Sequence, residues 1–109
     1  MADIRIDRDS VCAGDDTESH AAVIAVDDGL NLAAVVDQVL ANRYLASISG
    51  GKASWIIYAD GKAVGVAAQQ WARPRYLRDC AEARAPKVLR FGYAQQRCPA
   101  EVLQMIQHD

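Results

Sequence analysis

The N-terminal quarter of the chain brings several metal-ligand side chains close together in sequence. Cys12, Asp15, Asp16 and His20 lie within nine residues of one another. Thiolate and imidazole groups bind transition metals, and carboxylates can complete such a site. The spacing matches none of the paired Cys and His patterns of zinc sites, and no second pair follows. We therefore interpret this stretch as a polar turn, and we expect no metal and no other cofactor.

Catalytic groups are equally hard to assemble from this sequence. A cysteine nucleophile needs a nearby imidazole, yet the two histidines are His20 and His108, and His108 adjoins the C-terminus. The paired carboxylates near the N-terminus lack the apolar neighbours that general acid–base catalysis requires. Gly50-Gly51-Lys52 lacks the spacing of a phosphate-binding P-loop and precedes a predicted strand. The sequence predicts a protein that is not an enzyme; a ligand pocket between helix 31–42 and the sheet is the least favoured alternative.

Charge is distributed unevenly along the chain, although the net charge is only −2. Residues 1–28 contain eight acidic residues and two arginines, whereas residues 72–98 contain seven basic residues and two acidic ones. Such a chain either neutralises itself in the fold or presents two faces of opposite charge to partners. We expect a protein partner to bind the acidic side chains, which are Asp7, Asp9, Asp15, Asp16, Glu18, Asp27 and Asp28.

Arginines are interleaved with aromatic residues between positions 73 and 97. This combination binds phosphates and stacks on unpaired bases, and it is also enriched at protein interfaces. The acidic overall charge argues against a general nucleic-acid-binding protein. The alternative hypothesis is nonetheless a nucleic-acid-binding module that uses Arg73, Arg75, Tyr76, Arg78 and Arg90.

Hydrophobic periodicity predicts the elements that position these residues. Alternation predicts strands at Ala2–Arg8, His20–Val26 and Lys87–Tyr93. An apolar stripe predicts a helix that Asn31 caps and that stops at Asn42. A central hairpin spans Ser54–Trp71, with a type I′ turn at Asp60-Gly61. A short helical turn is possible over Leu77–Ala85, and a second helix begins at Pro99.

These elements predict a single α+β domain over residues 1–109. About five strands form a small mixed or antiparallel sheet against two helices, in the order ββαβββα. Over roughly residues 2–71, the element order resembles the β-grasp (ubiquitin-like) arrangement, in which a mixed sheet wraps one helix. The alternative is an antiparallel sheet, in another strand order, with both helices on one face.

Several sequence features bear on where the protein works. The first residues show no secretory signal, and no apolar run approaches the roughly 20 residues that cross a bilayer. Three widely spaced cysteines favour a reducing cytoplasm over a disulfide framework. We therefore expect a non-enzymatic, cytoplasmic protein-binding module without membrane contact. One plausible class is the bacterial immunity or antitoxin inhibitor, which masks a toxin's active site; acidic side chains would mimic phosphate in a basic nuclease cleft.

Overall fold

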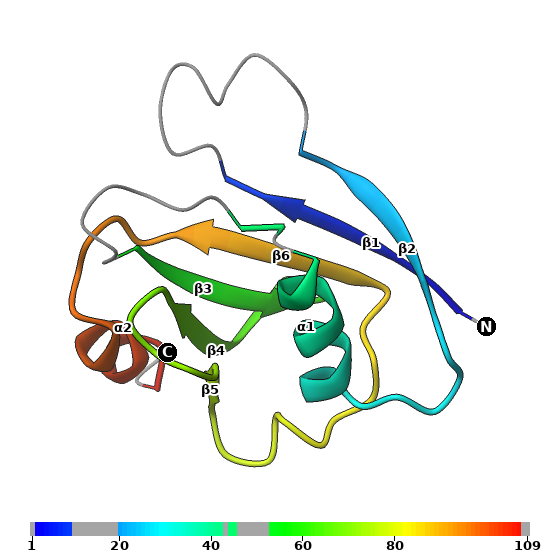
Figure 1. Cartoon of the computed structure of the whole chain (residues 1–109). Helices are drawn as coiled ribbons and strands as arrows, with labels where there is room; N and C mark the ends of the chain where they lie inside the picture. The colour runs from blue at the N-terminus through cyan, green and yellow to red at the C-terminus, as the bar shows by residue number, and fades with distance from the viewer. Residues whose placement is uncertain (1, 10–19, 43, 46–52, 108–109) are drawn as a thin grey trace.

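The computed structural model describes residues 2–9, 20–42, 44–45 and 53–107. Within these residues, six strands form one sheet and two helices pack on it (Figure 1). The predicted α+β class is confirmed, but the predicted five strands are wrong, because a two-residue strand was missed. The elements are β1 Ala2–Arg8, β2 Ala22–Val26, α1 Leu32–Ala41, β3 Ser54–Ala59, β4 Lys62–Ala68, β5 Arg75–Tyr76, β6 Val88–Tyr93 and α2 Pro99–Gln107.

The sheet is mixed, with the strand order β2-β1-β6-β3-β4-β5. β1 runs parallel to β6, and the other neighbouring strands are antiparallel. The first and last strands of the chain therefore lie side by side inside the sheet (Figure 1). This order also places the acidic N-terminal segment at one edge of the sheet and β5, from the basic segment, at the opposite edge.

Helix α1 covers one face of the sheet and forms the main core. Its stripe of Leu32, Val35, Val36 and Val39 is at most 1% exposed and packs with strand residues such as Phe91. Burying each such aliphatic side chain stabilises the fold by about 1.5–3 kcal/mol. The predicted caps are confirmed as well. The Asn31 side chain accepts a hydrogen bond from the Ala34 N–H at 2.9 Å, and Asn42 ends the helix.

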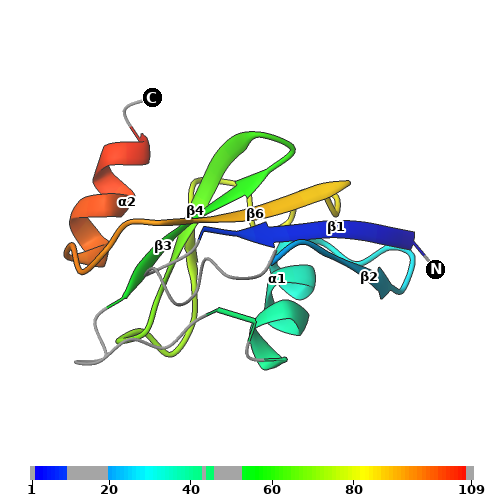
Figure 2. The same cartoon turned by 90° about the horizontal axis from the view of Figure 1, so that it is seen from above.

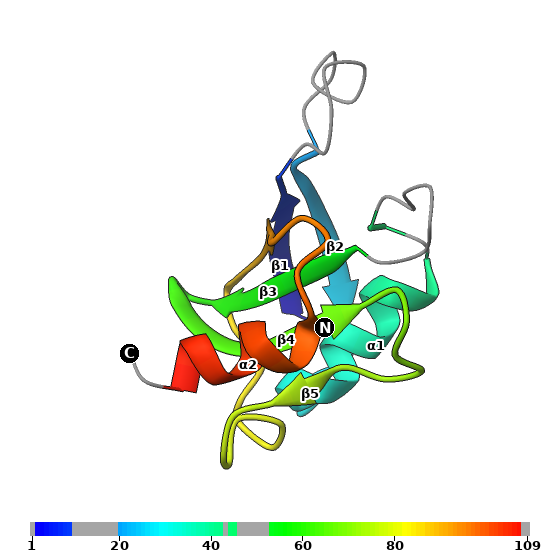
Figure 3. The same ribbon diagram turned by 90° about the vertical axis from the view of Figure 1, so that its left-hand side faces the viewer.

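Helix α2 lies on the opposite face and covers only part of it (Figure 2). Figure 3 shows α2 lengthwise in front of the sheet, where it contacts β4 and β3. Val102 and Ile106 of α2 pack with Val66, whereas Ile57 faces the α1 core. The hairpin strands are thus apolar on both faces, which requires cover on both sides. The alternative with both helices on one face is therefore wrong.

The central hairpin is confirmed, with strands that end earlier than predicted, at Ala68. Asp60 and Gly61 have φ angles of +49° and +85°, as a type I′ turn requires. The Asp60 carboxylate accepts hydrogen bonds from the Lys87 and Val88 N–H groups, both at 3.0 Å. These hydrogen bonds join the β3–β4 turn to the start of β6, so Asp60 helps to position β3, β4 and β6.

The segment between β4 and β6 differs from the prediction. The possible helical turn over Leu77–Ala85 is a series of turns, preceded by the short strand β5. Long-range hydrogen bonds hold this segment in place. Ala83 O accepts from the Leu32 N–H at 2.8 Å, and Ala81 O accepts from the Ala33 N–H at 3.1 Å. The segment therefore satisfies N–H groups in the first turn of α1, which no local pattern could reveal.

Candidate protein-interaction surface

In the described part of the chain, no helix covers the half of the sheet formed by β2, β1 and β6 on the face that α2 occupies elsewhere (Figure 2). Large apolar side chains are exposed there, namely Val23 at 62% and Val88 at 43%. Every second side chain of β1, namely Asp3, Arg5 and Asp7, lies on the same face and is also exposed. We call this surface the bare face, and its residues are Asp3, Arg5, Asp7, Val23, Ala25, Val88 and Arg90.

The strand register arranges the bare face in rows. One row crosses three strands: Arg5 of β1 is paired with Val23 of β2 on one side and with Val88 of β6 on the other. Asp7 pairs with Arg90 in a neighbouring row. A hollow of about 370 Å³ lies over β1 and β2, and Arg5, Asp7, Val23 and Val88 contribute to its lining. Exposed apolar side chains bordered by charges are typical of protein contact surfaces.

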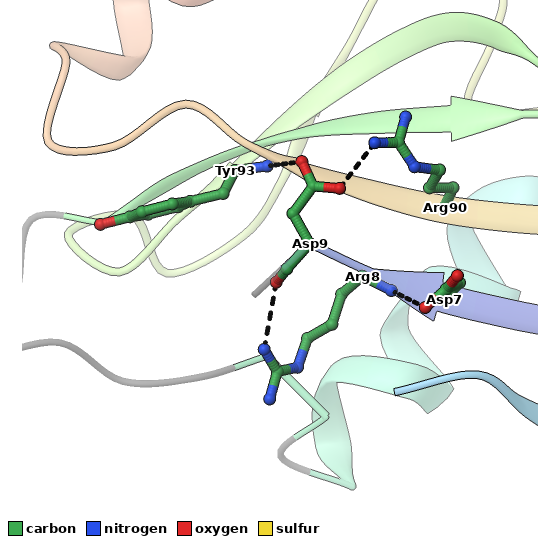
Figure 4. Close-up of polar contacts among 5 residues, drawn as sticks. All are labelled: Asp7, Arg8, Asp9, Arg90 and Tyr93. Carbon is green, nitrogen blue, oxygen red and sulfur yellow. Dashed lines mark hydrogen bonds and ion pairs between the residues drawn. The ribbon is translucent and has the colours of Figure 1, made fainter. Parts of the chain in front are cut away.

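A polar cluster stands at the end of β1, beside the bare face (Figure 4). The Asp9 carboxylate accepts from Arg90 Nη2 at 2.6 Å and from the Tyr93 N–H at 3.0 Å. The Arg90 guanidinium also lies 5.4 Å from the centre of the Tyr58 ring. Asp9 and Arg90 were predicted to serve two opposite surfaces. Instead they form an ion pair with each other, so their charges are partly neutralised within the fold.

Tyr44, which the sequence interpretation did not single out as functional, links the two ends of the β1–β2 connection. Arg8 Nε donates to Tyr44 O at 3.0 Å, and the Tyr44 hydroxyl donates to the His20 carbonyl oxygen. Burial raises the pKa of Tyr44 to about 12; the Asp7 charge adds to this shift and Arg8 opposes it. Tyr44 thus fixes the strand ends on either side of residues 10–19. Its position after α1 gave no signal in the sequence.

The remaining predicted acidic residues divide into two groups. Asp7 is exposed on the bare face, and Asp27 and Asp28 are exposed directly after β2. Because Val26 pairs with Ala2, these two acids lie at the end of the β1–β2 ladder where Asp3 is located. These four exposed acids therefore lie around β1 and β2, on a surface that also carries the exposed Arg5 and Arg90. The others, Asp15, Asp16 and Glu18, lie outside the described residues, as does Cys12 of the weighed metal site.

The alternative nucleic-acid cluster is separated by the fold. Arg73, Arg75 and Arg78 are exposed at the β5 edge, where the Arg75 guanidinium lies 4.5 Å from the Trp71 ring centre. Arg90 is on β6, with β3 and β4 in between. Tyr76 packs against the α1 core, and burial together with the Asp37 charge raises its pKa. Of the predicted cluster, only Arg73, Arg75 and Arg78 stay together, beside Trp71. We call these four residues the basic edge.

The described residues also bear on the metal site and the α1 pocket that the sequence brought into consideration. Among them, no group of three or more His, Cys, Asp and Glu side chains could hold a metal ion. The space between α1 and the sheet, where the least favoured alternative placed a pocket, is filled by core side chains. They are Leu32, Val36, Val39 and Trp55, each at most 1% exposed. No helix in these parts of the chain is long and apolar enough to span a membrane.

Comparison of the sequence with family models and curated proteins, and of the fold with solved structures, gave no match.

Proposed function

We propose that this chain is a non-enzymatic protein-binding module that recognises a basic partner surface through the bare face. The observation that supports the proposal is an excess of exposed acids around β1 and β2. Asp3, Asp7, Asp27 and Asp28 are exposed there beside Val23, and they outnumber the exposed arginines of the bare face, Arg5 and Arg90. Acidic side chains attract a basic partner and accelerate its association, whereas buried apolar contacts hold the complex together.

Within this proposal, the specific class is a cytoplasmic bacterial immunity or antitoxin inhibitor. Its target would be a toxin, such as a nuclease, with a basic active-site cleft. Carboxylates of Asp7, Asp27 and Asp28 would occupy the positions of substrate phosphates. Asp15, Asp16 and Glu18 lie outside the described residues and stay predicted partner-binding residues.

The proposed arrangement is β-grasp-like. A mixed sheet that wraps one helix supports this assignment, because α1 packs along the sheet and supplies most of the helical core residues. The short strand β5 and helix α2 would then be additions at the basic end. The additions cover that end and leave the acidic end open for a partner.

The test is binding to the product of the reading frame adjacent to this gene, measured by isothermal titration calorimetry. The double variant Asp3→Lys/Asp7→Lys reverses two exposed charges on the bare face. We expect it to weaken binding by about 100-fold, since like charges facing each other cost several kcal/mol. The matched control, Arg73→Glu/Arg78→Glu, reverses two exposed charges at the basic edge and should change affinity by less than about threefold.

Two results would overturn the proposal. One is the absence of a complex between the two unmodified proteins at about 10 μM, a concentration at which specific inhibitors are saturated. The other is a loss of affinity in the basic-edge control that equals or exceeds the loss in Asp3→Lys/Asp7→Lys.

A second candidate is single-stranded nucleic-acid binding at the basic edge. The contact between the Arg75 guanidinium and the Trp71 ring, with Arg73 and Arg78 nearby in the chain, favours this candidate. Arginines and stacked aromatic rings are the groups that hold unpaired bases. Fluorescence anisotropy with labelled single-stranded RNA and DNA at about 50 mM salt tests it. Binding that the triple variant Arg73→Ala/Arg75→Ala/Arg78→Ala abolishes would favour this candidate. Absence of binding would exclude it.

A further inference from the structure

The segment between β6 and α2 passes the end of the sheet where β3 begins (Figure 1). Hydrogen bonds hold it there. The Ala94 N–H donates to Ser54 O at 2.8 Å, and the Ser54 N–H donates to Gln95 O at 2.9 Å. The hydroxyl of Ser54, a fully buried residue, donates to Arg97 O at 2.8 Å. One buried serine of β3 thus fixes three residues of this segment.

Gln95 adopts a backbone conformation that a residue with a side chain rarely takes. Its φ angle is +59°, in the left-handed region that favours glycine. Such conformations persist only where the surrounding structure holds them, and they are concentrated at functional sites. At Gln95 the hydrogen bond from Ser54 supplies this support. Two residues later, the Arg97 side chain contacts Met105 of α2.

A hollow of about 220 Å³ lies between this segment, β3 and α2, and we call it the α2 hollow. Its apolar lining includes Ile56 of β3 together with Val102 and Met105 of α2. Gln95 and Arg97 contribute polar groups. Mostly apolar walls with a few polar groups are the usual composition of small-molecule sites.

Arg97 is the charged residue of the α2 hollow. Among the described residues, its guanidinium donates only to the Met105 sulfur, from Nη1 at 3.7 Å. A thioether is a weak acceptor and carries no charge to balance the guanidinium. Arg90, in contrast, is paired with the Asp9 carboxylate at 2.6 Å. The α2 hollow therefore combines apolar walls with a guanidinium that an anion can reach.

We propose that the α2 hollow binds a small apolar monocarboxylate, with the carboxylate on Arg97 and the apolar group between Ile56, Val102 and Met105. A guanidinium binds a carboxylate through two parallel hydrogen bonds, which matches the planar shape of this anion. The single positive charge balances a single negative charge. A dianionic phosphate would keep an unbalanced charge beside apolar side chains, which is unfavourable.

The volume of the α2 hollow limits the size of this ligand. Liquid water occupies about 30 Å³ per molecule, so the hollow has room for about seven waters. That space fits a ligand of about ten non-hydrogen atoms, smaller than the drug-sized ligands of pockets above about 300 Å³. Phenylacetate has this size. Because Met105 is 51% exposed, the site is open to solvent, and we expect a dissociation constant of about 1 mM.

NMR titration of the isotope-labelled full chain with phenylacetate, up to about 20 mM at neutral pH and constant ionic strength, tests this site. We expect saturating shifts of the amides of Gln95, Val102 and Met105. Phenylethanol has the same ring without the charge and should bind at least about tenfold more weakly. Acetate has the charge without the ring and should produce no saturating shift.

Arg97→Gln removes the charge from an exposed side chain, so we expect a folded protein. Its dissociation constant for phenylacetate should rise at least about tenfold, because a charged hydrogen-bonding group is lost. Arg97→Lys keeps the charge without the two-pronged geometry and should have an intermediate effect. The matched control is Arg84→Gln, at another exposed arginine, which pairs with Asn31 at the start of α1. It should change the dissociation constant by less than about twofold.

Three results would overturn the inference: no shift of these amides at about 20 mM phenylacetate, equally tight binding of phenylethanol, or an unchanged dissociation constant in Arg97→Gln. Tighter binding of phenyl phosphate would contradict the carboxylate. A short peptide that ends in phenylalanine presents the same ring and carboxylate, and its tighter binding would contradict a free acid as the ligand. None of these results affects calorimetric binding of a protein through Asp3 and Asp7.

Discussion

The two ends of the sheet have opposite properties. At the basic end, β4 is covered by α1 on one face and by α2 on the other, and β5 approaches closely at Gly65. At the acidic end, the β2–β1–β6 face is bare and exposes Val23 and Val88. Tight packing on both faces of the sheet is therefore found at the basic end, and the open sheet face at the acidic end. Changes at the basic end should therefore act on stability, and changes at the acidic end on binding.

The largest expected effect comes from Gly65→Ala at the basic end. A Cβ at this position would lie 2.6 Å from Arg75 O and 3.2 Å from Tyr76 Cα, so the β4–β5 pairing must shift. We expect a loss of about 2–3 kcal/mol in the free energy of unfolding, measured with urea. Ala25→Ser makes a similarly small change at the exposed acidic edge and should cost less than about 0.5 kcal/mol. Equal losses at the two edges would contradict the comparison.

Asp9 and Asp7 form a matched pair of neighbouring acids at the boundary. Asp9→Ala removes the acceptor for Arg90 and the Tyr93 N–H. Because the Arg90 and Asp9 side chains are 49% and 38% exposed, solvent weakens their ion pair, and we expect a loss of about 1–2 kcal/mol. Asp7→Ala should change stability by less than about 0.5 kcal/mol, yet slow association with a basic partner.

Chemical denaturation and stopped-flow binding separate the two roles of these acids. Asp9→Asn is the intermediate control, since its amide oxygen can still accept from the Tyr93 N–H but carries no charge. An Asp7→Ala protein as unstable as Asp9→Ala would show that the bare face contributes to stability as much as the polar cluster does.

Tyr76→Phe should have a smaller effect of opposite sign. The Tyr76 hydroxyl is buried and has no hydrogen-bond partner among the described residues. Removing an unsatisfied buried hydroxyl should raise the free energy of unfolding by about 1 kcal/mol in urea titrations. Tyr58→Phe, on the other face of the sheet, is the control and should be close to neutral. Destabilisation by Tyr76→Phe would mean that the hydroxyl is hydrogen-bonded in solution.

The smallest effect is the pH dependence that Tyr44 confers near the acidic end. Its pKa is raised to about 12 in the folded protein, above the ordinary value of 10.0. The folded state therefore keeps a proton that the unfolded chain loses, so stability is complete below pH 10 and declines as the pH rises toward 12. Tyr44→Phe should reduce this slope in thermal melts. Tyr76 contributes in the same direction, so a residual slope is expected, whereas an unchanged slope would contradict the assignment.

Much of the fold follows from local sequence patterns. The stripe from Leu32 to Val39, the Asn31 cap and the Asp60-Gly61 turn each specify their structure within a few residues. Strand β5 could not be predicted, since a strand of two residues is too short to show alternation. The turns at 77–85 are held by α1, far away in sequence.

The candidate surface was less predictable than the fold. Charge asymmetry along the chain predicted an acidic and a basic surface, and this stays a prediction. It did not reveal that Asp9 pairs with Arg90, because that contact joins residues 81 positions apart through the parallel β1–β6 pairing. The contribution of Tyr44 likewise depends on tertiary contacts. The sequence shows which charged residues are present, but the strand order determines which of them form ion pairs.

The most direct test of the central claim is an NMR titration of the labelled protein with the product of the adjacent reading frame. The account predicts that amide shifts concentrate at Asp3, Arg5, Val23 and Val88 on the bare face. Amides at Arg73–Arg78 should remain unchanged. Shifts that concentrate at Arg73–Arg78, with the bare face unchanged, would contradict it.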